Sequence, residues 1–399
     1  MRILQLCIRV PFPTVDGGSI AMYNSEVALI SNGATIKVLS FNTIKQFVDL
    51  DKLDVEYKKM TSIEAVYLDN NIHPLAAFLN LFTRQSYHVI RFIKNDFKQL
   101  LIDTLQKGEF EIIQLESLFM VPYVDEIRKF SKAKIVLRTH NIEHLIWKRM
   151  AENCSNIFKK WYLNLLAYRL KKFEVEAINK VDAITALTKE DEQLLISLGA
   201  LKPVFISPIG IQIGDYVQKN IPDNKVIFHI GAMDWLPNQE GISWFLEQVW
   251  PVIKNKYPET KLRLAGKKMP NSYFKYVDAQ CEIQEFVPDA QQFMNEGEIM
   301  VVPIFSGSGM RVKIIEGLAL GKAIISTSIG VEGIPVENGK QMIIANNRTE
   351  FIEALSHLLN NHKKVIDLGQ NARNFVESSF DNREIGKKLL LFYEELTFN

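Results

Sequence analysis

Short apolar runs alternate with longer amphipathic stretches along the whole chain. In the first half, the runs that predict buried strands are residues 3–8, 36–41, 112–115, 135–137 and 183–186. In the second half they are residues 226–230, 261–265, 282–286, 299–303, 323–326 and 342–345. Buried strands that alternate with helices are typical of parallel sheets with helices on both faces. The pattern therefore predicts an α/β protein.

Between these strands, apolar positions recur with helical spacing. Tyr23, Val27 and Ile30 follow the i, i+4, i+7 pattern and predict a helix after the first strand. Residues 143–178 predict either one long amphipathic helix or a broken pair of helices, and residues 383–398 predict a final amphipathic helix. Helices of this kind would bury their apolar faces against the sheets.

The composition of residues 199–225 indicates a boundary between two domains. This stretch holds three prolines and three glycines around a short apolar segment. A chain of 399 residues is long enough for two or three domains of roughly 100 to 200 residues each. We expect a first domain at residues 1–202, a linker at 203–224, a second domain at 225–380 and a terminal helix at 381–399.

Charge and cysteine content exclude several classes of protein. The 47 Lys and Arg against 46 Asp and Glu give a net charge of +1, so no global field attracts nucleic acid, and any binding to a charged surface must be local. Cys7, Cys154 and Cys281 are far apart and suggest neither a metal cluster nor a disulfide set. The first apolar run, about six residues, is shorter than the roughly 7 to 15 apolar residues of a signal peptide. These features are typical of a cytoplasmic protein.

Residues 300–327 carry the strongest candidate chemistry, because they predict a strand, a glycine turn, a helix and a second strand. Gly307 and Gly309 allow backbone N–H groups to approach a ligand closely. The positive end of the following helix favours a phosphate there. Arg311 and Lys313 add formal positive charge at the same place. The segment therefore predicts an anion site at the end of a parallel sheet.

Glu316 suggests that the anion is part of a nucleotide. A carboxylate beside a phosphate site usually accepts hydrogen bonds from hydroxyl groups, as in the ribose recognition of dinucleotide-binding folds. The alternative interpretation is an ordinary strand-to-helix turn in which Lys313 and Glu316 pair on a solvated helix face.

The motif Gly-Ser-Gly-x-Arg-x-Lys-x-x-Glu in this segment resembles the C-terminal signature of GT-B glycosyltransferases of family 4, a retaining group that uses nucleotide sugars. Four other segments resemble the same family in the same order: residues 13–19, 138–143, 206–211 and 231–238. The resemblance implies two Rossmann-like domains that face a central cleft. The first would bind the acceptor and the second the nucleotide sugar, and the C-terminal helix would cross back onto the first domain.

The resemblance also implies roles for individual residues in the second domain. Arg311 and Lys313 would neutralise the leaving diphosphate, and Glu316 would hold the ribose. The remaining donor-binding residues that the motifs imply are Gly18, Gly231, Asn238, Ser308, Gly309 and Met310. Ser308 stands where many members have the first of two glutamates, and residues 231–241 lack the Arg and Lys that many members carry there.

His140 is the catalytic candidate of the first domain. It follows the apolar strand at 135–137, which places it at the sheet's carboxyl end. In the resembled family this histidine contacts the donor sugar or the reaction centre, so the expected catalytic residues are His140, Arg311 and Lys313. His144 lies one helical turn further on; no third metal ligand is evident nearby, and we expect it on a solvated helix face.

The resemblance implies transfer of a sugar from a nucleotide-diphosphate donor to an acceptor hydroxyl, with retention, in bacterial surface polysaccharide or glycolipid synthesis. Neither a cofactor nor a metal is expected, and we interpret Asp49-Leu50-Asp51 as a solvated turn. Two alternatives remain. A GT-B sugar-nucleotide epimerase would need no acceptor, and a degenerate sugar-nucleotide-binding module, suggested by Ser308, would bind without catalysis.

The acceptor implied by the resemblance is a saccharide or a lipid-linked saccharide. A local group of basic and aromatic residues lies in the predicted helical stretch 143–178. One interpretation of this group is a peripheral contact with the inner face of the membrane. Its members are Lys159, Lys160, Trp161, Tyr162, Lys171 and Lys172. The alternative interpretation is a solvated helix face.

Overall fold

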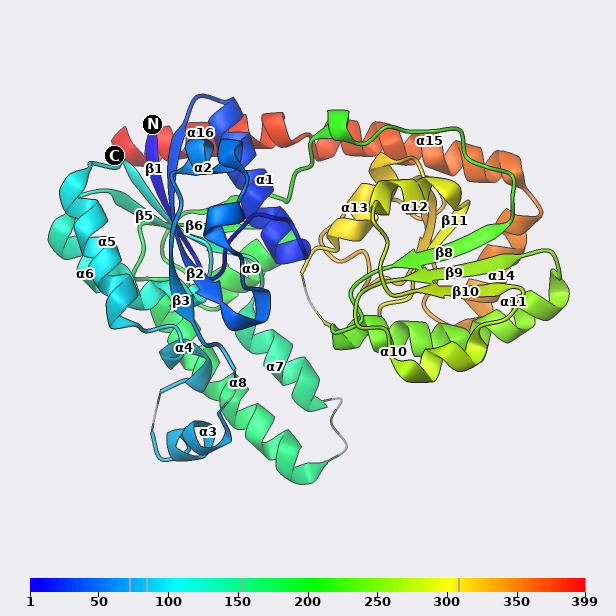
Figure 1. The fold of residues 1–399 in the computed structure, drawn as a ribbon, viewed down its shortest axis with the longest axis horizontal. Coiled ribbons are helices and arrows are strands. Elements are labelled where there is room, and N and C mark those ends of the chain that lie inside the picture. The colour runs from blue at the N-terminus through cyan, green and yellow to red at the C-terminus, as the bar shows by residue number, and fades with distance from the viewer. Residues whose placement is uncertain (72, 84, 153, 155, 308, 399) are drawn as a thin grey trace. The chain divides into compact units, whose positions relative to one another are not determined.

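The computed structural model describes residues 1–71, 73–83, 85–152, 154, 156–307 and 309–398. The chain forms two compact units (Figure 1). The first unit comprises Met1–Gly210 together with Asn382–Asn399, and the second comprises Ile211–Asp381. Each unit has its own parallel sheet with helices packed against it, so the predicted α/β class is confirmed.

Within the described residues, the sheet of the first unit has seven strands in the order β3-β2-β1-β4-β5-β6-β7. They are β1 (Arg2–Cys7), β2 (Thr35–Thr43), β3 (Glu64–Leu68), β4 (Ile112–Leu115), β5 (Lys134–Thr139), β6 (Ala183–Ala186) and β7 (Val204–Ile206). The sequence pattern did not predict the two edge strands, β3 and β7. Apart from Leu68, their residues are partly or fully exposed, so neither has the continuous buried apolar run of a central strand. β7 lies within the segment 203–224 that was expected to be a linker.

The first unit also contains α-helices and short 3-10 helices. The α-helices are α1 (Gly17–Ser31), α2 (Val55–Thr61), α3 (Pro74–Asn80), α4 (Tyr87–Ile90), α5 (Asn95–Lys107), α6 (Val124–Phe130), α7 (Glu143–Glu152), α8 (Ile157–Ala177), α9 (Lys189–Ser197) and α16 (Asn382–Phe398). Single turns of 3-10 helix are η1 (Ile44–Gln46) and η2 (Leu50–Lys52), and a longer one is η3 (Leu118–Tyr123). The stretch 143–178 is thus a broken pair, α7 and α8.

Helix α16 completes the first unit by packing on α1. A side chain at Gly386 would collide with the carbonyl oxygen of Ala28, so only glycine permits this close approach of the two helices. On the same helix, the fully buried Tyr393 donates a hydrogen bond of 2.5 Å to Oε1 of Gln114 in β4. The last helix therefore contributes to the core of the first unit.

Within the described residues, the second unit has a six-stranded sheet in the order β10-β9-β8-β11-β12-β13. Its strands are β8 (Val226–Ile230), β9 (Lys261–Ala265), β10 (Cys281–Gln284), β11 (Ile299–Val302), β12 (Ala323–Ser326) and β13 (Ile343–Ile344). Its helices are α10 (Leu236–Trp244), α11 (Trp250–Lys256), α12 (Ala290–Glu296), α13 (Val312–Ala319), α14 (Arg348–Leu359) and α15 (His362–Ser379), with η4 (Ile213–Asp215), η6 (Asn271–Tyr276) and a π-helical turn, η5 (Phe245–Val249).

The strand order of each sheet reverses once. In the first sheet the chain runs outward from β1 to β3 and returns to place β4 on the other side of β1. In the second it runs from β8 to β10 and returns to place β11 on the other side of β8. In open parallel sheets, ligands bind beyond the carboxyl ends of the strands at such a reversal. The segments that follow β1, β4, β8 and β11 are therefore where a site is expected.

No helix among the described residues combines the length with the apolar character needed to cross a bilayer.

Candidate functional site

A cluster of polar side chains surrounds Gly231, which directly follows β8. A Cβ atom on Gly231 would lie 2.5 Å from Nζ of Lys313, 3.0 Å from Nδ2 of Asn238 and 3.1 Å from Nε2 of His229. A side chain there would push the amine of Lys313 aside and crowd Asn238 and His229, so glycine leaves room for the cluster. The structure therefore brings together three of the predicted residues, Gly231, Asn238 and Lys313, and adds His229.

Lys313 is held at this cluster by two neighbours. Its Nζ donates a hydrogen bond of 2.7 Å to Oδ1 of Asn238 and lies 3.4 Å from Nε2 of His229. Nδ1 of His229 lies 2.7 Å from the carbonyl oxygen of Val301, which can only accept, so Nδ1 carries the proton and Nε2 faces the lysine as an acceptor. Burial, reinforced by the charge of Arg311, lowers the pKa of Lys313 to about 7. Burial and Lys313 together lower the pKa of His229 well below its ordinary value.

A second cation lies at the start of α13, which begins at Val312. Arg311 is only 5% exposed, and its guanidinium carbon lies 5.2 Å from the ring centroid of Trp235. In the turn before it, Gly307 and Gly309 have φ angles of +91° and +84°, a backbone conformation that favours glycine. The amino end of α13 therefore combines a buried guanidinium with a glycine turn, which is the arrangement of an anion site.

Met310 follows these glycines in the sequence. The side chain of Met310 is buried, with 8% of its surface exposed. We therefore expect its backbone amide, rather than its side chain, to contact the nucleotide sugar. Ser308, the residue that departs from the family motif, lies outside the described residues.

Glu316 lies one turn along α13 from Arg311 and Lys313. Its Oε1 accepts a hydrogen bond of 2.9 Å from the hydroxyl of Tyr216, which follows η4. Burial raises the pKa of Glu316, although Tyr216 and Lys313 offset part of this effect. Because the amine of Lys313 binds Asn238, the structure does not show the Lys313–Glu316 surface pair that was the alternative interpretation. The carboxylate is instead held in place by a tyrosine from a distant part of the sequence.

In the first unit, His140 follows β5 and is held by a buried carboxylate. Nε2 of His140 lies 2.7 Å from Oε2 of Glu116, the residue that follows β4. The same oxygen accepts a hydrogen bond of 3.1 Å from Arg138, and Gln114 donates to the other oxygen. Because Gln114 in turn accepts from Tyr393, a chain of hydrogen bonds links α16 to His140. The structure thus places His140 at the carboxyl end of the sheet on a fixed partner.

The charges around His140 determine how each partner titrates. Burial alone would raise the pKa of Glu116, but Arg138 and His140 outweigh it and hold that pKa below its usual value. Burial lowers the pKa of His140, and its hydrogen bond to Glu116 offsets this only in part. Near neutral pH, Glu116 is therefore ionised and His140 is neutral. Since a carboxylate can only accept, Nε2 of His140 then carries its proton and Nδ1 is the acceptor.

Gly18 lies in the first turn of α1. The N-cap residue Asp16 accepts a hydrogen bond of 3.0 Å from the amide of Ser19 and pairs with Arg9 at 2.8 Å. A side chain at Gly18 would collide with the guanidinium of Arg9. The protein's own carboxylate therefore caps this helix end, and an anion next to Gly18 would have Arg9, rather than a bare helix terminus, as its nearest cation.

The expectation for His144 was wrong. This residue is buried, not solvated, and its Nδ1 lies 2.6 Å from Oε2 of Glu174 in α8. Glu174 also accepts from the amide of Glu143, at 2.9 Å. Burial and the neighbouring Glu174 raise the pKa of Glu143 to about 8. His144 therefore joins α7 to α8 and has a structural role.

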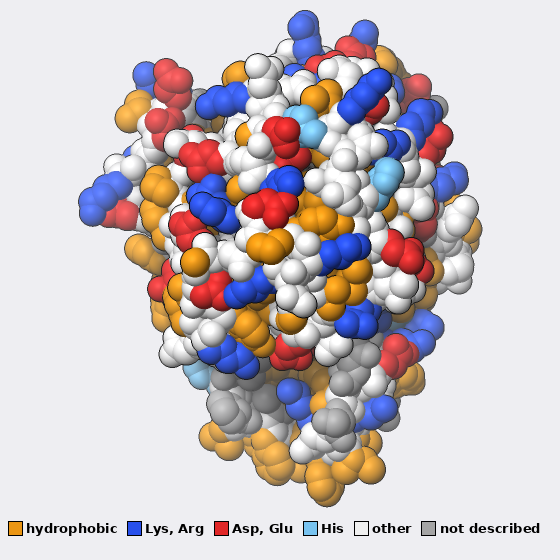
Figure 2. All heavy atoms as spheres, turned by 90° about the vertical axis from the view of Figure 1, so that its right-hand side faces the viewer, with side chains coloured by type: hydrophobic (Ala, Val, Ile, Leu, Met, Phe, Trp, Pro, Cys, Tyr) orange, Lys and Arg blue, Asp and Glu red, His pale blue; other side chains and the backbone are white. Residues whose placement is uncertain are grey.

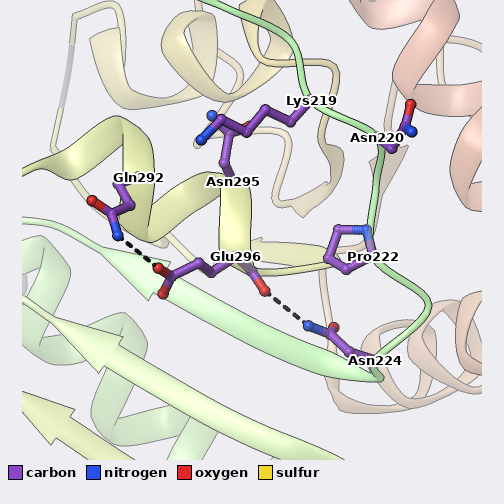
Figure 3. Close-up of a pocket in the computed structure, with 7 residues that line it drawn as sticks. All are labelled: Lys219, Asn220, Pro222, Asn224, Gln292, Asn295 and Glu296. Carbon is purple, nitrogen blue, oxygen red and sulfur yellow. Dashed lines mark hydrogen bonds between the residues drawn. The ribbon is translucent and has the colours of Figure 1, made fainter.

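A pocket of about 380 Å³ lies elsewhere in the second unit (Figure 3). Its lining includes Asn224, just before β8, and Glu296, at the end of α12; the carbonyl of Glu296 accepts a hydrogen bond of 2.9 Å from Asn224. The pocket therefore lies at the amino end of β8, whereas the cluster around Gly231 lies at its carboxyl end. The pocket is therefore separate from the predicted site.

Known proteins resemble this chain in both sequence and fold. Residues 224–361 match the family model described as Glycosyl transferases group 1. A protein of Klebsiella pneumoniae, described as an uncharacterized 44.6 kDa protein in the cps region, is 22% identical over 96% of this chain and 97% of its own length. An uncharacterized glycosyltransferase of Haemophilus influenzae is 24% identical over 65% of this chain and 71% of its own.

Two solved structures share the fold over nearly the whole chain. HepE of Anabaena in complex with UDP has a TM-score of 0.69 at 14% identity and covers 99% of this chain and 100% of that one. Sucrose-phosphate synthase of Thermosynechococcus elongatus has a TM-score of 0.75 at 14% identity, with 99% of both chains covered.

The two parallel sheets and the likeness to these solved structures show the GT-B fold, and the matching family model indicates a glycosyltransferase. More particularly, its second unit carries a group 1 glycosyltransferase domain at residues 224–361.

Proposed function

We propose that this protein is a retaining, family 4-like glycosyltransferase that moves a sugar from a nucleoside-diphosphate donor to an acceptor hydroxyl. The observation that carries the proposal is the cluster beside Gly231. There the amine of Lys313 is held at the strand reversal, on the helix that starts next to Arg311. HepE, which has been solved in complex with UDP and with UDP-glucose, supports a nucleotide-sugar donor.

The proposed chemistry depends on stabilising the leaving group. Sugar transfer passes through an oxocarbenium-like transition state while negative charge grows on the departing diphosphate. Groups already oriented toward that charge lower the barrier most. Arg311, Lys313 and the amides of residues 308–310 are the groups we assign to this role. Because Lys313 already binds Asn238 and His229, its position requires no rearrangement when the charge develops.

Glu316 is the residue we assign to the ribose. An ionised carboxylate has about four acceptor sites, and Tyr216 occupies one of them at 2.9 Å. The remaining sites suit the two ribose hydroxyls. Tyr216 would then keep the carboxylate oriented while the nucleotide enters.

The first unit supplies the residues that position donor and acceptor. His140, held by Glu116, would present its Nδ1 acceptor to a sugar hydroxyl, and Gly18 would allow close approach beside Arg9. The acceptor we propose is a saccharide or lipid-linked saccharide of surface polysaccharide or glycolipid synthesis. The description of the Klebsiella relative, which places that protein in a cps region, supports this setting. A cytoplasmic enzyme with a peripheral membrane contact would meet such an acceptor.

A panel of UDP-, GDP- and ADP-sugars, assayed with and without saccharide acceptors, tests this proposal. Release of the nucleoside diphosphate is the expected result, and the anomeric configuration of the product, read by NMR, tests retention. An epimerase would change the sugar without releasing the diphosphate. A binding module would show calorimetric binding and no turnover. Either of these outcomes would overturn the proposal.

Metal independence is a separate part of the proposal. Asp49 is the N-cap of η2 and pairs with the exposed Lys52 at 3.1 Å, so Asp49-Leu50-Asp51 forms a solvated turn in the structure. We expect activity to survive an excess of EDTA, because two cationic side chains neutralise the diphosphate. Loss of activity with EDTA and its recovery with manganese would contradict this assignment.

A further inference from the structure

Exposed apolar side chains gather on two neighbouring elements of the first unit. Four lie on or just after α3 and four lie on α8, and each is between 56% and 82% exposed. We call them the α3–α8 surface: Leu75, Phe78, Leu79, Phe82, Ile157, Phe158, Trp161 and Tyr168. Figure 2 shows hydrophobic side chains concentrated at the lower end of the view, the end at which Figure 1 places α3 and the start of α8. Large patches of this kind on a protein surface mark interaction sites.

Hydrogen bonds between the two helices hold this surface together. Arg169 of α8 donates to the carbonyl oxygens of Asn80 and Leu81, each at 2.9 Å. These carbonyls lie at the carboxyl end of α3, where a helix has acceptors left over. The rings of Phe78 and Phe82 meet edge to face with centroids 5.7 Å apart. The apolar side chains are therefore displayed on helices that are fixed to each other.

The segments that form this surface are positively charged. Residues 70–95 and 153–173 contain eight Lys and Arg and no Asp or Glu, although the chain as a whole has a net charge of only +1. Lys159 and Lys160 are exposed directly beside Phe158 and Trp161. These two segments therefore carry a local excess of positive charge, and part of it lies next to exposed apolar side chains.

We propose that the α3–α8 surface docks on an anionic lipid bilayer. Apolar and aromatic side chains enter the headgroup region, where Trp and Tyr are favoured, and flanking lysines attract anionic lipids. A second copy of the chain fits less well, because a two-fold interface would set each basic surface against its own duplicate. The inference rests on the proposed function for its purpose, which is to bring a lipid-linked acceptor to the enzyme.

Co-sedimentation with vesicles tests the proposal on the full chain. The vesicles are phosphatidylcholine alone, or phosphatidylcholine with about one third phosphatidylglycerol. We expect binding to the anionic vesicles that weakens as salt is raised. Near such a surface each lysine contributes roughly fivefold in affinity, so Lys159→Gln with Lys160→Gln is expected to weaken binding by about tenfold or more. Phe158→Ser with Trp161→Ser is expected to abolish the binding that remains at high salt.

Matched controls lie elsewhere on the protein. Lys387 and Lys388 are also an exposed adjacent pair on a helix, and Phe286 is 77% exposed in the second unit. Their replacement by Gln and Ser respectively is expected to leave vesicle binding unchanged, and all variants are expected to keep the wild-type melting temperature. Equal losses in the controls, or no binding of the wild type to anionic vesicles, would overturn the proposal.

Two further measurements separate this inference from its rivals. A dimer in sedimentation velocity that Phe158→Ser dissociates would identify a second copy as the partner and would refute docking on lipid. Donor hydrolysis in solution is expected to be the same in the surface variants as in the wild type. Vesicle binding without any hydrolysis would contradict the proposed function alone, and hydrolysis without vesicle binding would contradict the docking surface alone.

Discussion

The titration of Lys313 makes the donor site testable by pH. Lys313→Gln removes the positive charge but keeps a side-chain N–H group that can donate to Asn238. If the ammonium contacts the diphosphate, the lost hydrogen bond to a charged group is worth roughly 1.5 to 3 kcal/mol, which is about 10- to 150-fold in the dissociation constant. We therefore expect UDP or GDP to bind the variant more weakly by a factor in this range.

The sign of the pH dependence follows from the lowered pKa. Below about pH 7 the free protein already carries the ammonium, whereas above that value a proton must be taken up when the diphosphate binds. Wild-type affinity should therefore fall as pH rises above 7, by up to about tenfold per pH unit. The free energy of unfolding follows the opposite trend to the affinity, because the unfolded chain binds the proton of Lys313 more tightly than the folded chain does. Lys313 therefore contributes a free energy of unfolding that increases as pH rises from about 7 to 10.5.

Isothermal titration calorimetry between about pH 7 and 9 is the assay, in buffers of different ionisation enthalpy that reveal the uptake of protons. Lys340→Gln is the matched control, because this lysine also lies in the second unit but is 57% exposed and pairs with Glu337. It should change neither the affinity nor its slope with pH. A wild-type affinity that stays level across this range, or a slope that survives in Lys313→Gln, would refute the contact between Lys313 and the diphosphate.

Four other substitutions probe the remaining contacts. Arg311→Ala should reduce transfer by roughly 10²-fold with little change in melting temperature, and near-normal turnover would remove Arg311 from the leaving-group site. Glu316→Gln should weaken nucleoside diphosphate binding by roughly 1.5 to 3 kcal/mol in calorimetry, and Tyr216→Phe by about 1 kcal/mol; unchanged affinity in both would exclude the ribose role. Glu116→Gln should lower kcat while leaving donor affinity intact, and should shift the acidic limb of the rate profile to lower pH, because Glu116 raises the pKa of His140. An unshifted profile would contradict this coupling.

In the first sheet the central strands could be predicted from the sequence, whereas the two edge strands could not. A strand covered on both faces needs apolar residues throughout, and the fully buried strands at 112–115 and 323–326 were therefore predicted with the bounds they have. β3 and β7 each have a neighbour on one side only and are partly exposed, so their residues follow no continuous apolar pattern. In the first sheet the prediction thus depended on how completely each strand is covered. The partly exposed edge strands of the second sheet, β10 and β13, were nevertheless predicted, at residues 282–286 and 342–345.

In the candidate site, residues that are close in sequence could be predicted, whereas partners from distant parts of the sequence could not. The glycine turn, Arg311, Lys313 and Glu316 are close in sequence and could be recognised as a motif. Their partners could not, because His229 and Tyr216 lie 84 and 100 residues away from the side chains that they contact. A histidine inside the otherwise apolar strand β8 was the one available signal for His229.

The same limit applies to Glu116 in the first unit. It lies 24 residues before His140, and only the pairing of β4 with β5 brings the two ends together. The burial of His144 was unpredictable for a similar reason, since its partner Glu174 comes from the next helix. A single sequence contains no record of such pairs.

The return of α16 to the first unit has a consequence for synthesis on the ribosome. Residues 1–210 emerge first, but the helix that packs on α1 is made only after the 171 residues of the second unit. At roughly 5 to 20 residues per second, that interval is about 10 to 30 seconds. During it, the face of α1 around Ala28 and the amide of Gln114 have no helix α16 to contact. The second unit is continuous in sequence and can therefore finish folding first. The first unit, although most of it is synthesised earlier, can be completed only after α16 has been made.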